Sequence, residues 1–266
     1  MNKWTWTKTG YAGLVRVMLA TLLSAAISLP AAAGPREQAK RIHDRLAGVP
    51  PSETVLAQME TAIQGGDPES AAYLAMDNVN FYNVTLKNFA APWTNRDRSV
   101  FVPLNDYIAT VIGMVRDDIP FNTLLSADLA YVGRPGVVAS APAPNNNNHF
   151  EELEANSVNL RDDLVSVPQS SINGLPPGAT AGVVTSRAAS EAFFVAGTNR
   201  AMFRFTLLNH MCNDLEQVRD FYLSPDRVRQ DLSRSPGGDS RLFLNNCVGC
   251  HTGMDPMAGA YAYYNY

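Results

Sequence analysis

The chain contains few cysteines and no excess of basic residues. Three cysteines among 266 residues are too few for the disulfide network that holds small secreted domains together. The 21 Lys and Arg residues are outnumbered by 25 Asp and Glu residues, which gives a formal net charge of −4. This balance argues against the basic face that nucleic-acid binding requires, so we expect no nucleic-acid partner. No apolar run after residue 33 reaches the ~20 residues that a membrane-spanning helix needs.

The N-terminus has the order of a secretory signal peptide. Basic residues precede a short apolar stretch, and small residues follow it (Lys3, Lys8 and Arg16; 17–29; 31–33). This order predicts cleavage after Ala33, so that residues 1–33 are removed and the mature protein is periplasmic or extracellular. An uncleaved membrane anchor is the alternative, but the apolar stretch is shorter than a spanning helix requires.

Helical patterns cover most of the remaining chain, and strand patterns are sparse. Apolar residues at helical spacing, with capping residues before them and glycine or proline after them, predict helices at 35–46, 52–63, 67–89, 105–116, 121–129, 186–196, 198–212 and 224–233. A further helix, begun by Asp239, leads into residue 247 with Leu242 and Phe243 facing inward. We therefore predict a mainly α fold.

One long segment lacks this helical character. Residues 133–182 are rich in proline, asparagine and glycine, which interrupt long elements. We predict an irregular connection there, with one short helix near 150–155. It separates an N-terminal helical region at 34–132 from a second helical region at 183–266.

The most specific motif is the C-x-x-C-H run Cys247-Val248-Gly249-Cys250-His251. This spacing is the attachment signature of c-type haem. Two thiols separated by two residues can add to the two vinyl groups of one porphyrin, and the adjoining imidazole can bind the iron as proximal ligand. We therefore predict covalent haem c on Cys247 and Cys250, with its iron bound by His251. Export fits this prediction because bacterial c-type haem is attached outside the cytoplasmic membrane.

The second axial ligand of such an iron is less well defined. The histidines and methionines considered for it are Met254, Met257, His210, Met211, Met202, His149 and His43. Met254 and Met257 follow His251 so closely that they lie on the proximal side. His210 and Met211 precede the motif and are the preferred distal candidates, although core positions beside Cys212 are the alternative. Only fifteen residues follow His251, so either the distal ligand comes from upstream or the chain is a fragment of a longer protein.

Cys212 stays unpaired when the other two cysteines are assigned to haem. A lone thiol in an exported protein is commonly a small buried hydrophobe. An axial or redox role is the alternative.

The segment 247–256 resembles the C-x-x-C-H-x-x-[MI]-D-P segment of cytochrome c-like C-terminal domains in planctomycete-type exported bacterial haem proteins. Residues 182–187 and 199–212 resemble the segments that precede that motif, and residues 39–51 resemble the start of a companion domain. The sequence departs from the family after Pro256, where members commonly continue with a G-F-x-x-E-N-F-D-like stretch. The resemblance implies an exported haem protein and supplies no substrate.

These observations favour an electron-transfer module that exchanges single electrons with a redox partner protein. A peroxidase-like haem oxidoreductase with an open distal site is the first alternative, and an envelope binding module with accessory haem is the second. A dithiol redox pair is disfavoured because no βαβ pattern surrounds the motif. A zinc site is disfavoured because no second ligand pair lies at suitable spacing.

Overall fold

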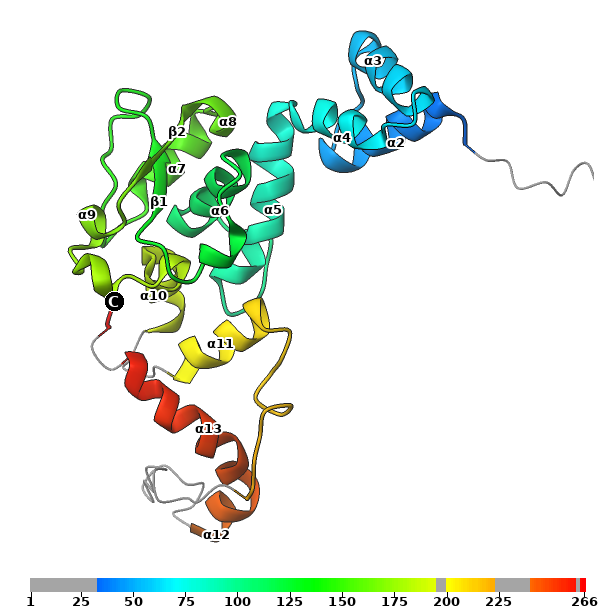
Figure 1. Ribbon diagram of the computed structural model, residues 1–266. Helices are drawn as coiled ribbons and strands as arrows, with labels where there is room; N and C mark the ends of the chain where they lie inside the picture. The colour runs from blue at the N-terminus through cyan, green and yellow to red at the C-terminus, as the bar shows by residue number, and fades with distance from the viewer. Residues whose placement is uncertain (1–32, 195–199, 223–239, 262–263) are drawn as a thin grey trace, which may run out of the picture.

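The computed structural model describes residues 33–194, 200–222, 240–261 and 264–266 (Figure 1). Within these residues the fold is mainly α, with one small antiparallel sheet, which confirms the predicted fold class. The predicted signal peptide, apart from Ala33, lies outside the described residues. The helix expected at 224–233 and the cap expected at Asp239 also lie outside them.

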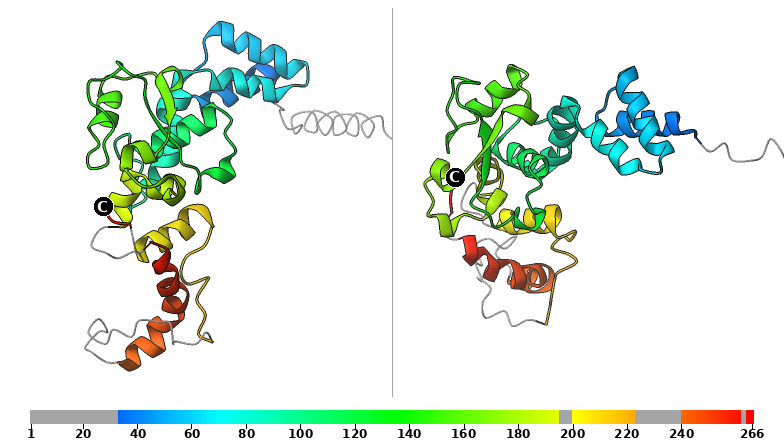
Figure 2. Two further views of the ribbon diagram at one scale, coloured as in Figure 1. Left: turned by 60° about the vertical axis from the view of Figure 1, so that its left-hand side comes forward. Right: turned by 45° about the horizontal axis from the view of Figure 1, so that its top comes forward.

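Three N-terminal helices form a small unit at one side of the molecule (Figures 1 and 2). They are α2 (Pro35–Leu46), α3 (Glu53–Gln64) and α4 (Pro68–Met76). Ser52 Oγ accepts from the Val55 amide to cap α3, as the sequence pattern predicts. The unit has its own buried cluster, made of Ala39, Leu56, Met59, Ala71 and Ala75.

The helix predicted over 67–89 is interrupted at residues 77–78, so the prediction is wrong at this break, but the chain is helical on both sides of it. α4 ends at Met76, and the chain resumes as η1 (Phe81–Leu86), α5 (Lys87–Ala90) and η2 (Ala91–Thr94). At the break, the Asn80 amide donates to Asn78 Oδ1. A short polar side chain that bonds to nearby backbone competes with the helical ladder, which explains the interruption.

The centre of the molecule is α6 (Asp106–Arg116), close to the predicted 105–116, with the Asn105 side chain accepting from the Ile108 amide as its cap. The sequence suggests one apolar face, but residues 107–114 are buried all round the helix. A two-stranded sheet covers one side, with β1 (Ala130–Gly133) antiparallel to β2 (Leu164–Val167) and Ala130 opposite Val167. A Cβ at Gly113 would lie 2.1 Å from the Tyr131 ring, so only glycine permits this close approach.

The segment 133–182 is part of this body and not an irregular linker, which corrects the prediction. It supplies β2 and several helices, α7 (Asn148–Ala155), α8 (Leu160–Asp163), α9 (Ser170–Asn173) and η4 (Pro177–Ala179). Four of its apolar side chains enter the main core, Phe150, Leu153, Leu160 and Leu164. The helix predicted at 121–129 is also wrong: only the short η3 (Phe121–Thr123) forms before β1 begins.

The C-terminal helices lie below the body in Figure 1. After η5 (Gly182–Thr185) and α10 (Arg187–Phe193), they are α11 (Arg200–His210), α12 (Ser240–Leu242), η10 (Phe243–Cys247), α13 (Val248–Ala258) and η11 (Gly259–Tyr261). The chain then returns to α10, where the Tyr264 ring stacks on Phe194 at 5.9 Å between ring centroids. Among the described residues, none of the helices combines the length and the apolarity needed to cross a membrane.

Candidate haem attachment site

The C-x-x-C-H motif lies at the junction of η10 and α13. Cys247 ends η10, and Cys250 and His251 lie in the first turn of α13. Residues three and four apart lie along the same face of a helix, so the two thiols and the imidazole share one face. Both thiols are free and half-buried, and Cys250 Sγ lies 3.7 Å from the Leu215 carbonyl oxygen. The structure thus brings the three predicted attachment residues together.

The opposite face of α13 is covered by a preceding segment of the chain. The Asp220 amide donates to the Gly249 carbonyl at 2.9 Å, and Thr252 Oγ1 donates to the Asp220 carbonyl at 2.8 Å. The Phe221 ring lies against Gly249, where a Cβ would be 2.6 Å from a ring carbon. The glycine inside the motif therefore permits this packing on the face opposite the thiols, and the thiols themselves stay half-buried.

His251 is held by a carboxylate one turn further along α13. Its Nδ1 lies 3.0 Å from both carboxylate oxygens of Asp255, whose side chain is 6% exposed. The Phe243 ring meets the imidazole edge to face, with 5.1 Å between centroids. A carboxylate can only accept, so Nδ1 carries the proton and Nε2 is the nitrogen left for a metal.

Arg200 connects this pair to α11. Its Nε donates to Asp255 Oδ1 at 2.9 Å, across 55 residues of sequence. Arg200, Asp255 and His251 therefore form a continuous line of charge-assisted hydrogen bonds. Neither Arg200 nor Asp255 was predicted from the sequence as a site residue. The i, i+4 spacing of His251 and Asp255 was a usable signal, but nothing local to the motif indicates Arg200.

The two preferred distal candidates do not contact the motif in the described part of the chain. His210 Nε2 lies 2.8 Å from Tyr107 Oη, and the His210 ring meets the Trp93 ring at 5.6 Å. Burial lowers the pKa of His210 to about 4. Arg200 begins α11 and His210 ends it, and ten residues of helix span about 15 Å. Since Arg200 is the end of α11 that contacts Asp255, His210 lies at the end away from it, and Met211 is exposed.

The remaining methionine candidates occupy three different environments. Met254 lies on the same face as the motif, one turn beyond His251, and is buried. Met257 is exposed, and Met202 is buried within the main core.

His43 and His149 are structural. His43 Nδ1 lies 2.7 Å from the Val49 carbonyl oxygen. His149 Nε2 accepts from the Gly133 amide at 2.9 Å, and its Nδ1 lies 2.6 Å from the Ser140 carbonyl oxygen. Both rings are buried with these partners, so they fix loops and are not directed at the motif.

Cys212 corrects one expectation, because its side chain is exposed and not a buried hydrophobe. It lies just after α11 with a left-handed backbone, φ 53°.

The donor set fits covalent haem. Two free thiols at i and i+3 and an imidazole with its Nδ1 engaged lie on one partly accessible helix face. In the described part of the chain, no group of three or more His, Cys, Asp or Glu side chains is arranged to hold a metal ion. Comparison with protein families, with curated proteins and with solved structures gives no match.

Proposed function

We propose that this chain is an exported c-type haem protein that acts as an electron-transfer module. The observation that carries the proposal is the single helical face at the junction of η10 and α13, where two free thiols stand beside an imidazole held through Nδ1 by a buried carboxylate. Cys247 and Cys250 would each form one thioether to the porphyrin, and His251 Nε2 would bind the iron. Haem supplies an iron centre that gains and loses single electrons.

Asp255 and Arg200 set the electrostatics of this face. A carboxylate bonded to the outer nitrogen of a ligating imidazole makes the imidazole a stronger donor. Arg200 shares that carboxylate and so withdraws part of its negative charge. The balance between the two residues provides a way to tune the iron potential without touching the iron.

Exposed apolar side chains flank the motif. Phe221, Leu242 and Leu244 are 51%, 42% and 46% exposed, so the prediction that Leu242 faces inward is wrong. Phe221 contacts Gly249, and the two leucines lie on the helical turns that precede Cys247. Apolar surface of this kind typically marks a binding region, which supports the approach of a redox partner protein to this part of the molecule.

A haem oxidoreductase is the second candidate. It is favoured by the Asp255–His251 hydrogen bond, which strengthens the proximal donor, and by the engagement of His210 with Tyr107. If no side chain takes the distal position, that position is open to exogenous ligands.

The α2–α4 unit, with its own core, supports an accessory binding role as well.

The optical spectrum of protein matured with a c-haem assembly system separates these functions. An electron carrier with two axial ligands gives a low-spin spectrum and resists carbon monoxide. A high-spin spectrum with ready binding of carbon monoxide or cyanide would instead favour the oxidoreductase. Recovery of the haem protein from the periplasm, with an N-terminus at Gly34, would support the predicted export.

A further inference from the structure

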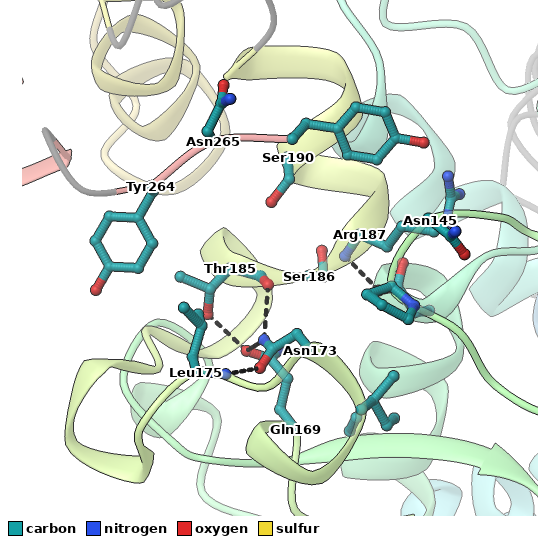
Figure 3. A pocket seen from close by; sticks show the side chains of 15 residues that line it. Asn145, Gln169, Asn173, Leu175, Thr185, Ser186, Arg187, Ser190, Tyr264 and Asn265 are labelled. Atoms are coloured by element: carbon teal, nitrogen blue, oxygen red, sulfur yellow. Dashed lines mark hydrogen bonds between the residues drawn. The ribbon is translucent and has the colours of Figure 1, made fainter.

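A separate cavity of about 420 Å³ opens on the body of the molecule. Figure 3 shows it between α10, the turn at Asn173 and Leu175, and the C-terminal residues Tyr264 and Asn265. A second cavity of about 460 Å³ adjoins it, and Asn145, Arg187 and Tyr266 line both. None of residues 247–251 lines either cavity.

Arg187 is the charged group between the two cavities, and its side chain is only 7% exposed. Nη1 donates to Glu191 Oε2 at 2.6 Å, and Nη2 donates to Asn147 Oδ1 at 3.1 Å. Nε is buried and has no partner among the described residues. Nε and Nη2 point along the same edge of the guanidinium group. On this edge Nη2 makes one long hydrogen bond to a neutral amide, and the Arg187 side chain also interacts with Tyr266.

A buried charged donor without an acceptor is unfavourable. The edge that Nε and Nη2 form is also the one that binds carboxylates through two parallel hydrogen bonds. Asp106, which also lines the first cavity, is committed elsewhere, because its carboxylate accepts the amides of Tyr107, Arg187 and Ala188. The guanidinium edge is therefore the available anchor.

The rest of the cavity wall is mainly apolar or already hydrogen-bonded. Ile172 and Leu175 provide aliphatic surface, and Tyr264 provides a ring. Gln169 and Thr185 bond to each other and are satisfied, with Thr185 Oγ1 donating to Gln169 Oε1 at 2.6 Å. A wall of this kind, with one convergent charged group, is typical of sites for small organic molecules.

We propose that this cavity binds a small organic carboxylate. Its carboxylate group takes the Nε and Nη2 edge of Arg187, and its aliphatic or aromatic body lies against Ile172, Leu175 and Tyr264. Glu191 competes for the same guanidinium group, but its side chain is 54% exposed and its hold is weakened by solvent.

Calorimetric titration of the full-length haem protein with benzoate tests this site, with benzyl alcohol as the uncharged analogue. We expect saturable binding of benzoate and at least tenfold weaker binding of benzyl alcohol. Arg187→Gln should weaken benzoate binding at least tenfold, whereas Arg45→Gln, an exposed position on α2, should leave it unchanged. Glu191→Gln should strengthen binding severalfold because it removes the competing carboxylate.

A second cavity variant covers the case in which Arg187→Gln is not stable. If Arg187→Gln does not fold, as judged by circular dichroism, then Ile172→Trp, which fills the cavity and keeps the guanidinium group, must abolish benzoate binding. Absence of saturable benzoate binding, equal affinity for benzyl alcohol, or unchanged affinity in both cavity variants would overturn the proposal.

Discussion

At the level of single residues, Asp255 joins the imidazole of His251 to the guanidinium of Arg200. Its carboxylate is almost fully buried, so its charge is weakly screened. In the proposed haem protein, a negative charge at this position would stabilise the oxidised iron through the imidazole, and a positive charge at Arg200 would oppose that effect.

Asp255→Asn keeps an acceptor for His251 Nδ1 and removes the charge, so the midpoint potential should rise. A rise on the order of 60 mV corresponds to a tenfold change in a one-electron equilibrium. Spectroelectrochemical titration measures it, with Asp77→Asn, an exposed ion-pair residue, as the matched control.

Arg200→Gln should shift the potential in the opposite direction, because Asp255 then keeps its full charge beside His251. Equal shifts in Asp255→Asn and Asp77→Asn, or shifts of the same sign in Asp255→Asn and Arg200→Gln, would show that the line of hydrogen bonds does not act on the iron.

At the level of elements, α13 is defined by what packs on each of its faces. The segment at Asp220 and Phe221 covers Gly249 and Thr252, and Arg200 of α11 holds Asp255. The two glycines of α13 differ in a measurable way. A Cβ at Gly249 meets the Phe221 ring, whereas nothing lies within 4 Å of a Cβ at Gly253.

Gly253→Ala should stabilise the protein by up to about 1 kcal/mol, which is the helix-propensity difference between the two residues. Gly249→Ala should be less stable than Gly253→Ala by about 1 kcal/mol, because the added methyl group displaces the Phe221 ring. Denaturant unfolding measures both free energies. Equal free energies of unfolding would mean that Phe221 does not pack on the motif helix.

A second prediction for the helices concerns His210, the last residue of α11. Burial lowers the folded-state pKa of His210 to about 4 from its ordinary value of 6.5. Below pH 6.5 the unfolded chain therefore takes up a proton at His210 before the folded protein does, so stability is lost as the pH falls from 6.5 to 4. The free energy of unfolding should fall by about 2 kcal/mol through this residue. This is less than the full pKa difference would give, because His210 is only partly buried.

Comparison of the native chain with His210→Asn isolates this contribution. The free energy of unfolding of the variant should fall less steeply than that of the native chain between pH 6.5 and 4. Identical pH dependence in the two proteins would place His210 in solvent, contrary to its contacts with Tyr107 and Trp93.

At the level of the whole molecule, the parts set by local sequence were predicted best. The bounds of α2 and the cap of α3 follow from proline, serine and glycine positions. The assignment of Cys247, Cys250 and His251 to haem stays a prediction from one five-residue motif. The two strands, of four residues each, are too short to give a clear alternation and are paired across a long connection. The position of the two strands is set by their packing on α6. The same packing buries apolar side chains of residues 133–182, the segment that was expected to be a linker.

The site residues that the sequence did not predict are also positioned by tertiary packing. Asp255 lies within the reach of one helical turn, but Arg200 is brought to it only by the packing of α11 against α13. His210 illustrates the opposite case. Its position on the helix before the motif favoured a distal role, and the fold instead directs its ring toward Tyr107 and Trp93.

The most direct test of the proposed function is the intact mass of the mature protein produced with a c-haem assembly system, denatured and extracted with acid acetone. We expect a mass increase of one haem, absent from a Cys247→Ala, Cys250→Ala double variant produced in the same way. The unmodified polypeptide mass for the native chain, while a known c-type cytochrome matured in parallel retains its haem, would contradict covalent attachment.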